Sequence, residues 1–203
     1  MAYQVDVLSA RLHLAPLVAS DRDLVAKIFA ARSTSEFLGV DFTIRSNFES
    51  MMNRRLAYAG TKGTGHWLIR EKSGQAVGLA HLRDSWELPA GAPEIGWYLD
   101  VDYTGRGYAT EATNALVQHG IQHLNMPAVW ALIHVENHAS RAVAERAGFV
   151  AVDQGLYYGA LHTVFRFCGP NGRVLHGPGL GNARPGQSNC PSPRNTDGQP
   201  ADR

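Results

Sequence analysis

Two glycines that flank one arginine, Gly105-Arg106-Gly107, stand between a predicted strand at residues 94–99 and a predicted helix at residues 111–124. Glycine lets the backbone pass where a side chain would clash. The first turn of a helix also carries N–H groups that have no partner within the helix. The segment therefore predicts a site whose backbone donors bind an anion such as a pyrophosphate.

Two common phosphate-binding motifs do not fit this turn. A P-loop needs Gly-Lys followed by Ser or Thr, and the sequence has no such tripeptide. A dinucleotide-binding turn needs Gly-x-Gly-x-x-Gly or Ala, but the third of these positions after Gly105 and Gly107 is Thr110. The acidic residue expected about 20 residues further on is also missing, since none lies between Glu111 and Glu136.

The segments around the turn alternate between strand and helix patterns. Alternating or continuous apolar runs predict strands, and apolar residues three and four apart predict helices. The predicted strands are residues 11–17, 66–70, 76–82, 94–99, 129–133, 150–152 and 163–167, and the predicted helices are residues 20–31, 46–59, 111–124 and 140–147. This order predicts an α/β (α+β) domain built around one mixed sheet.

Composition narrows the class of protein. The 203 residues are 44% hydrophobic and carry a net charge of +1 with interspersed charges, which argues against a nucleic-acid partner. No apolar run approaches the roughly 18 residues that span a bilayer, so we expect no membrane association. The two cysteines, Cys168 and Cys190, are too few for a disulfide framework. With no secretory signal pattern at the start, we expect a cytoplasmic protein.

Residues 1–168 are predicted to form one domain. After Cys168 the chain is rich in Gly, Pro, Ser and Asn and has few large aliphatic residues. Such a segment buries too little apolar surface to offset the entropy lost on ordering. We therefore expect residues 169–203 to form a disordered tail.

Three segments resemble the GNAT superfamily of acyl-CoA-dependent N-acyltransferases. The family's turn has Gln or Arg, two residues, Gly, one residue, then Gly or Ala, and residues 104–109 match it except that Thr104 replaces Gln or Arg. The following Thr-Glu-Ala is similar to the branch that includes the ribosomal-protein-alanine acetyltransferases. Residues 94–97 (Glu-Ile-Gly-Trp) and 137–149 also resemble segments of that branch, in the same order. The resemblance covers residues 11–168.

The resemblance implies a fold and a co-substrate. The fold would be a GNAT-type mixed, mostly antiparallel sheet, splayed between two parallel strands and flanked by about four helices. Acetyl-CoA would lie in the gap between strands 94–99 and 129–135, and no metal would be needed. The residues implied to bind it are Leu99, Val101, Thr104, Gly105, Arg106, Gly107, Tyr108, Ala109, Thr110 and Asn137.

The resemblance also implies an acetyl transfer by direct attack of a primary amine in a ternary complex. Glu94 would accept the amine's proton through a water. A backbone N–H near Tyr98 would stabilise the oxyanion, and Ser140 would protonate or stabilise the departing thiolate. The acceptor would be a protein N-terminus or a small-molecule amine, and the protein a monomer or a homodimer.

Each of these side chains has a structural alternative. Glu94 could be an ordinary charge at a strand start, and Tyr98 a half-buried strand aromatic. Asn137 could cap the following helix, which is compatible with ligand contact. Ser140 could bond only to backbone, and Arg106 could meet only solvent. The alternative function is a non-catalytic acyl-CoA-binding sensor or scaffold of the same fold.

Overall fold

The computed structural model describes residues 4–89 and 91–169. Its centre is one sheet in the order β1-β2-β3-β4-β5-β6-β8-β7. The strands are β1 Val7–Leu8, β2 Leu12–Pro16, β3 Gly65–Glu71, β4 Ala76–Asp84, β5 Pro93–Leu99, β6 Ala128–His134, β7 Val150–Tyr157 and β8 Ala160–Cys168. The helices are α1 Arg22–Ile28, α2 Arg45–Leu56, α3 Tyr108–Gln118 and α4 His138–Arg146, with short 3₁₀ turns at Ala19–Asp21, Arg32–Thr34 and Val101–Tyr103.

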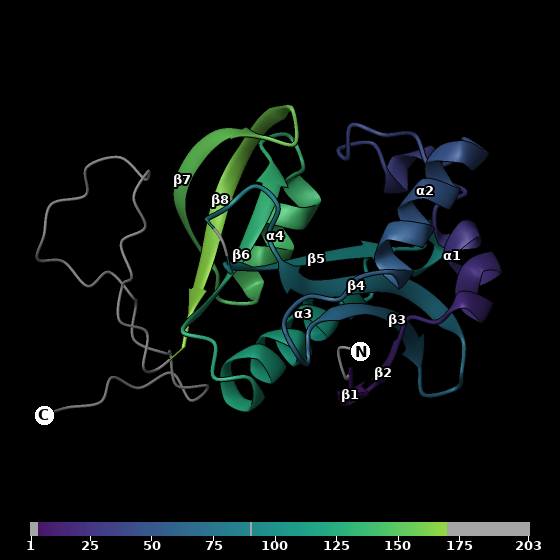
Figure 1. Ribbon diagram of the computed structural model, residues 1–203, viewed down its shortest axis with the longest axis horizontal. Coiled ribbons are helices and arrows are strands. Elements are labelled where there is room, and N and C mark those ends of the chain that lie inside the picture. Colours follow the sequence, from purple (N-terminus) through teal and green to yellow (C-terminus); the bar gives the residue numbers. More distant parts are fainter. Residues whose placement is uncertain (1–3, 90, 170–203) are drawn as a thin grey trace, which may run out of the picture.

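The sheet separates two hydrophobic cores, because successive side chains of a strand point to opposite faces. Leu68 of β3 belongs to the core under α1 and α2, together with Phe29 and Met52. Its neighbour Trp67 belongs to the core under α3 and α4, together with Leu116. Figure 1 shows α1 and α2 side by side, away from α3 and α4. The fold is therefore three layers, with helices on both faces of the sheet.

The sheet opens between β5 and β6. These two strands are parallel, whereas all the other neighbours in the sheet are antiparallel. Their only register pair joins Glu94 to Trp130, near the start of both strands. Beyond it the strands diverge, and Figure 1 shows β6, β7 and β8 turned away from the strands that precede them. The predicted mixed sheet, splayed between two parallel strands and flanked by four helices, is confirmed.

Some element boundaries differ from the prediction. Helix α3 begins at Tyr108, three residues earlier than expected, because the N–H of Glu111 already donates to the carbonyl of Gly107 at 3.0 Å. Its last turn is a π-helix at His119–His123. Strand β1 has only two residues, too short for a sequence pattern.

Two further expectations concern membrane association and the C-terminal tail. Among the described residues, no helix is long and apolar enough to cross a membrane. Strand β8 ends at Cys168, and the expected tail lies outside the described residues apart from Gly169. The predicted disorder of residues 169–203 therefore stays a prediction.

We expect Phe165→Ala to lower the free energy of unfolding by about 3–5 kcal/mol, because Phe165 in β8 is 1% exposed and its removal leaves a cavity. Leu161→Ala changes the same strand at a side chain that is 44% exposed, and should cost less than about 1 kcal/mol. Urea unfolding of both variants measures the difference. Equal losses would contradict the described packing.

Candidate active site

The segment that joins β5 to α3 turns on two glycines with left-handed backbone. The φ angles are +74° at Gly105 and +80° at Gly107, values that other residues adopt only with strain. Within the described part of the chain, no group accepts a hydrogen bond from the backbone N–H groups of residues 105–110. These consecutive donors, at the positive end of a helix, are available to an anion.

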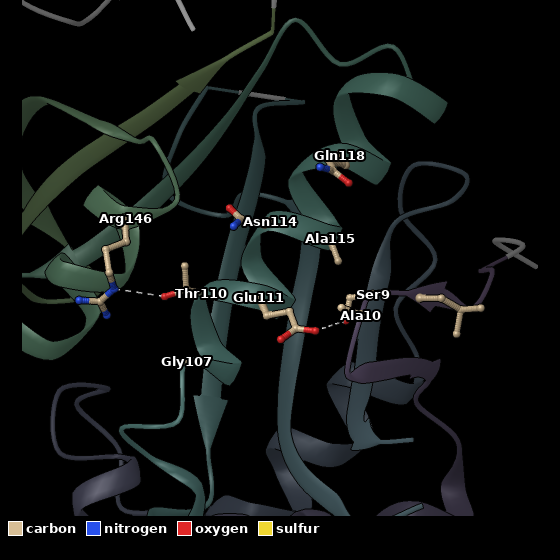
Figure 2. A pocket seen from close by; sticks show the side chains of 10 residues that line it. Ser9, Ala10, Gly107, Thr110, Glu111, Asn114, Ala115, Gln118 and Arg146 are labelled. Atoms are coloured by element: carbon tan, nitrogen blue, oxygen red, sulfur yellow. Dashed lines mark hydrogen bonds between the residues drawn. The ribbon is translucent and has the colours of Figure 1, made fainter. Parts of the chain in front are cut away.

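Polar contacts fix the start of α3 to its surroundings. One carboxylate oxygen of Glu111 accepts hydrogen bonds from Ser9 Oγ and the Arg11 N–H, both at 2.7 Å, and the other accepts from Arg11 Nε at 2.6 Å. Thr110 Oγ1 accepts from Arg146 Nε of α4 at 3.4 Å. Figure 2 shows Ser9, Thr110, Glu111 and Arg146 around a cavity of about 520 Å³. The turn's amides are therefore held in place from both sides.

A larger cavity, of about 970 Å³, follows the gap between β5 and β6. Its walls come from these two strands, the start of α4, α2 and the loop before α2. We call it the central cavity. The predicted site residues that line it are Glu94, Tyr98, Leu99, Val101, Thr104, Gly105, Ala109, Asn137 and Ser140. The structure thus brings together residues that the sequence separates by more than forty positions.

Four predicted cofactor residues do not line the central cavity. Gly107 and Thr110 line the smaller cavity at the start of α3. The Tyr108 side chain is buried in the core under α3. The Arg106 guanidinium folds back and donates to the carbonyl of Asp102 at 2.8 Å. From this turn, backbone groups are better placed than side chains to meet a ligand.

Glu94 is buried at the start of β5 and densely hydrogen-bonded. Its carboxylate accepts from Ser85 Oγ at 2.6 Å, from the Tyr158 hydroxyl at 2.8 Å and from Arg83 Nη2 at 3.1 Å. His81 Nε2 lies 3.8 Å from Glu94 Oε1, beyond hydrogen-bond length. Burial alone raises the pKa of Glu94, but His81, Arg83 and Ser85 lower it to about 2. Glu94 is therefore ionised at neutral pH and is a weak proton acceptor.

Tyr158 reaches Glu94 from the hairpin between β7 and β8. Its φ is +50°, a left-handed conformation that is uncommon outside glycine and that can cost about 1–3 kcal/mol. Its hydroxyl accepts from Arg83 Nη2 at 2.9 Å while it donates to Glu94. Burial and the charge of Glu94 raise the pKa of Tyr158, so it stays a neutral donor. Sequence reasoning missed this residue, although a Tyr-Gly turn between two strands was visible.

Three further predicted site residues on the central cavity are Asn137, Ser140 and Tyr98. Asn137 Oδ1 accepts from the Ser140 N–H at 2.9 Å, which makes Asn137 the cap of α4. No hydrogen bond joins Ser140 Oγ to any described residue, and Ser140 lines the central cavity. The Tyr98 ring packs 5.4 Å from Phe29 and 4.8 Å from the Arg55 guanidinium, measured to ring centroids. Ser140 thus has a hydroxyl free for a ligand.

A row of polar residues on β3 and β4, also missed from the sequence, lines the same cavity. His66 pairs in register with His81, which pairs with Gly96 of β5. A side chain at Gly96 would place its Cβ 2.3 Å from His81 Cε1, so glycine leaves room for the imidazole. Burial lowers the pKa of His66 well below its usual value and that of His81 to about 4. Both rings are neutral at pH 7. The sequence signal that could have identified these two histidines is their position as polar residues within otherwise apolar strands.

The fold is that of a known family of acyltransferases. The Acetyltransferase (GNAT) domain model matches residues 11–150, and the chain belongs to this family. The family predicted from the three sequence segments is confirmed, and with it the enzyme class that the family defines, an acetyl-CoA-dependent acyltransferase.

Individual relatives agree with the predicted branch. A putative ribosomal N-acetyltransferase from Bacillus subtilis, YdaF, is 30% identical over 111 residues, which are 53% of this chain and 59% of that protein. The chain therefore spans less than two thirds of this relative. An acetyltransferase structure from Agrobacterium tumefaciens has a TM-score of 0.69 and 26% identity, covering 82% of this chain and 96% of that one. Mycobacterium smegmatis RimJ, in complex with CoA-disulfide, matches at TM-score 0.67 and 20% identity, covering 82% and 88%.

We expect the protein to lose stability as the pH falls below about 6.5. The unfolded chain protonates His81 near its ordinary pKa of 6.5, whereas the folded chain does so only near 4. The unfolded state therefore binds more protons in this interval, which costs about 2 kcal/mol between pH 7 and pH 5. Urea unfolding at each pH measures this slope. His81→Gln should flatten it, and an unchanged slope would contradict the assignment.

Proposed function

We propose that this protein transfers an acetyl group from acetyl-CoA to a primary amine, by direct attack within a ternary complex. The observation that carries the proposal is the central cavity. It runs from the glycine turn, with its available N–H groups, to the buried carboxylate of Glu94 along the gap between β5 and β6. A long, narrow thioester carrier matches that arrangement, with its diphosphate at one end and its acyl group at the other.

The co-substrate would use backbone rather than side chains. Beyond the single pair at Glu94, no described strand pairs with the edge of β5 that faces β6. Pantetheine amides could add to this edge near Leu99 and Val101, as an extra strand does. The diphosphate would accept from the N–H groups of residues 105–110. Asn137 and Ser140 would flank the thioester from the start of α4.

The chemistry needs a neutral amine, an oxyanion donor and a stabilised thiolate. A backbone N–H near Tyr98 would take the oxyanion, and Ser140 Oγ would donate to the thiolate. A carboxylate with a pKa near 2 holds a proton poorly. Glu94 would therefore orient the ammonium and pass its proton through water to solvent, rather than keep it.

The proposed acceptor is a primary amine, on a protein N-terminus or on a small molecule. The relative from Bacillus subtilis carries the name of a putative ribosomal N-acetyltransferase, which supports a protein N-terminus. A small-molecule amine fits the same cavity, and the protein could act as a monomer or a homodimer. A cytoplasmic location is part of the proposal.

We expect Gly107→Val to weaken coenzyme A binding at least about tenfold, because a branched side chain beside the turn would strain its backbone and displace its amides. Gly74→Val is the matched control. Its φ of +97° imposes a similar strain in the β3–β4 hairpin, where nothing lies within 4 Å of the added Cβ. Isothermal titration gives both dissociation constants. Equal values for Gly107→Val and wild type would place the cofactor elsewhere.

We expect Glu94→Gln to lower kcat at least about tenfold while the dissociation constant for coenzyme A changes less than twofold. We expect kcat to fall because the substitution removes the negative charge that would face the ammonium. Glu36→Gln, an exposed carboxylate on the same cavity, should leave kcat nearly unchanged. A thiol-release assay over a panel of amines measures turnover. Binding of acetyl-CoA without turnover of any amine would favour the non-catalytic sensor or scaffold.

A further inference from the structure

Unsatisfied polar atoms gather on one wall of the central cavity. In the described part of the chain, the buried side-chain polar atoms without a hydrogen-bond partner are Thr34 Oγ1, Arg55 Nη1, His66 Nδ1, both ring nitrogens of His81, and Thr113 Oγ1. All but the last belong to residues that line this cavity. Buried polar groups are normally paired. Their concentration here indicates a surface shaped for a polar ligand group.

Arg55 is the cation in this group, and no described carboxylate pairs with it. It projects from α2, with its guanidinium carbon 4.8 Å from the ring centroid of Tyr98 and 5.7 Å from that of Phe29. The ion pairs of the described residues do not include it. Burial lowers the pKa of Arg55 from its ordinary value, which reflects the cost of keeping this charge from water. An arginine stays protonated nonetheless.

The other charges nearby do not supply an anion for Arg55. Arg83 is bonded to Glu94 at 3.1 Å, so each of these charges already has its partner. Arg54, the neighbour of Arg55, is exposed and lies 5.7 Å from the Trp86 ring centroid. The exposed carboxylate of Glu36 also lines the cavity but forms no ion pair with Arg55, so among the described residues this guanidinium has no carboxylate partner.

The two histidines beside this charge are neutral donors and acceptors. His66 and His81 face the cavity on the same side of the sheet, with ring centroids 5.5 Å apart. Since their pKa values lie below neutrality, they add hydrogen-bonding capacity without adding charge. A guanidinium with neutral N–H donors near it suits an oxyanion, which accepts several hydrogen bonds at once.

We propose that the acceptor amine carries an anionic group, a carboxylate or a phosphate, and that this group binds Arg55 at the wall formed by His66 and His81. The inference rests on the proposed function, because it names the class of amine that the same cavity selects. The amine would then point toward Glu94 and the acyl group. A site built for an anion rejects the uncharged analogue, since the buried charge is then left unpaired.

The test compares amines that differ only in the anion. The two pairs are γ-aminobutyrate with γ-aminobutyramide, and phosphoethanolamine with ethanolamine. For wild type, we expect kcat/KM to be about 10- to 100-fold higher for the anionic member of at least one pair, the range of a charged hydrogen bond. The pair that shows the preference distinguishes carboxylate from phosphate. No preference in either pair would overturn the proposal.

Substitutions of Arg55 and of its neighbour Arg54 distinguish a role in anion recognition from a role in folding. Arg55→Met should remove the preference through a higher KM for the anionic amine, so that the kcat/KM ratio between the two members of a pair falls to about one. Arg55→Lys should keep part of the preference, and Arg54→Met, at the exposed neighbour, should keep all of it. A preference that survives in Arg55→Met would also overturn the proposal.

A measurement without turnover keeps this site testable if the proposed function fails. Succinate or inorganic phosphate, added to the full chain, should raise the Tm of wild type but not that of Arg55→Met. Without anion, Arg55→Met should melt at or above wild type, because it removes a half-buried charge that no described carboxylate pairs with. If no amine is acetylated, the proposed function is wrong. If neither anion shifts the Tm of wild type, or Arg55→Met melts lower, the anion site is wrong.

Discussion

The rest of the structure depends on a single parallel contact. Strands β5 and β6 pair only where Glu94 meets Trp130, and their divergence beyond that point opens the central cavity. A fully paired sheet would satisfy the backbone of β5 internally and leave no space between the two halves. The parted edge instead exposes backbone groups beside a cavity wall. The turn that follows β5 then carries its available N–H groups to the end of the same gap.

The buried carboxylate of Glu94 lies at the point where strands β5 and β6 part. Glu94 lies at the pairing position, and its carboxylate bonds to Arg83 of β4 and to Tyr158 of the β7–β8 hairpin. The Tyr158 hydroxyl, hydrogen-bonded to both members of this buried ion pair, therefore ties together the two halves of the sheet that otherwise separate. A different position of the hairpin would take one hydrogen-bond partner away from each of these buried charges, so the contact favours one arrangement of the hairpin. Arg83, which also hydrogen-bonds to Tyr158, is one of the groups that keep the pKa of Glu94 low.

The sequence predicted local features well and contacts between distant segments poorly. The turn at Gly105 and Gly107 could be read from residue spacing, because its backbone conformation depends on those residues alone. The Asn137 cap was likewise local and is confirmed. The wall of Arg55, His66 and His81 joins one helix to two strands, a contact that no local pattern encodes.

These two kinds of feature correspond to the two ends of the central cavity. The proposed cofactor end would use backbone groups of one continuous segment, β5 to α3, so its geometry tolerates many side chains. The proposed acceptor end would use side chains from α2, β3, β4 and the β7–β8 hairpin, which can change independently while the sheet is kept. Arg55, which pairs with no described carboxylate, costs stability through the partial burial of its charge. A charge held at such a cost is better explained by what it binds than by the fold it belongs to.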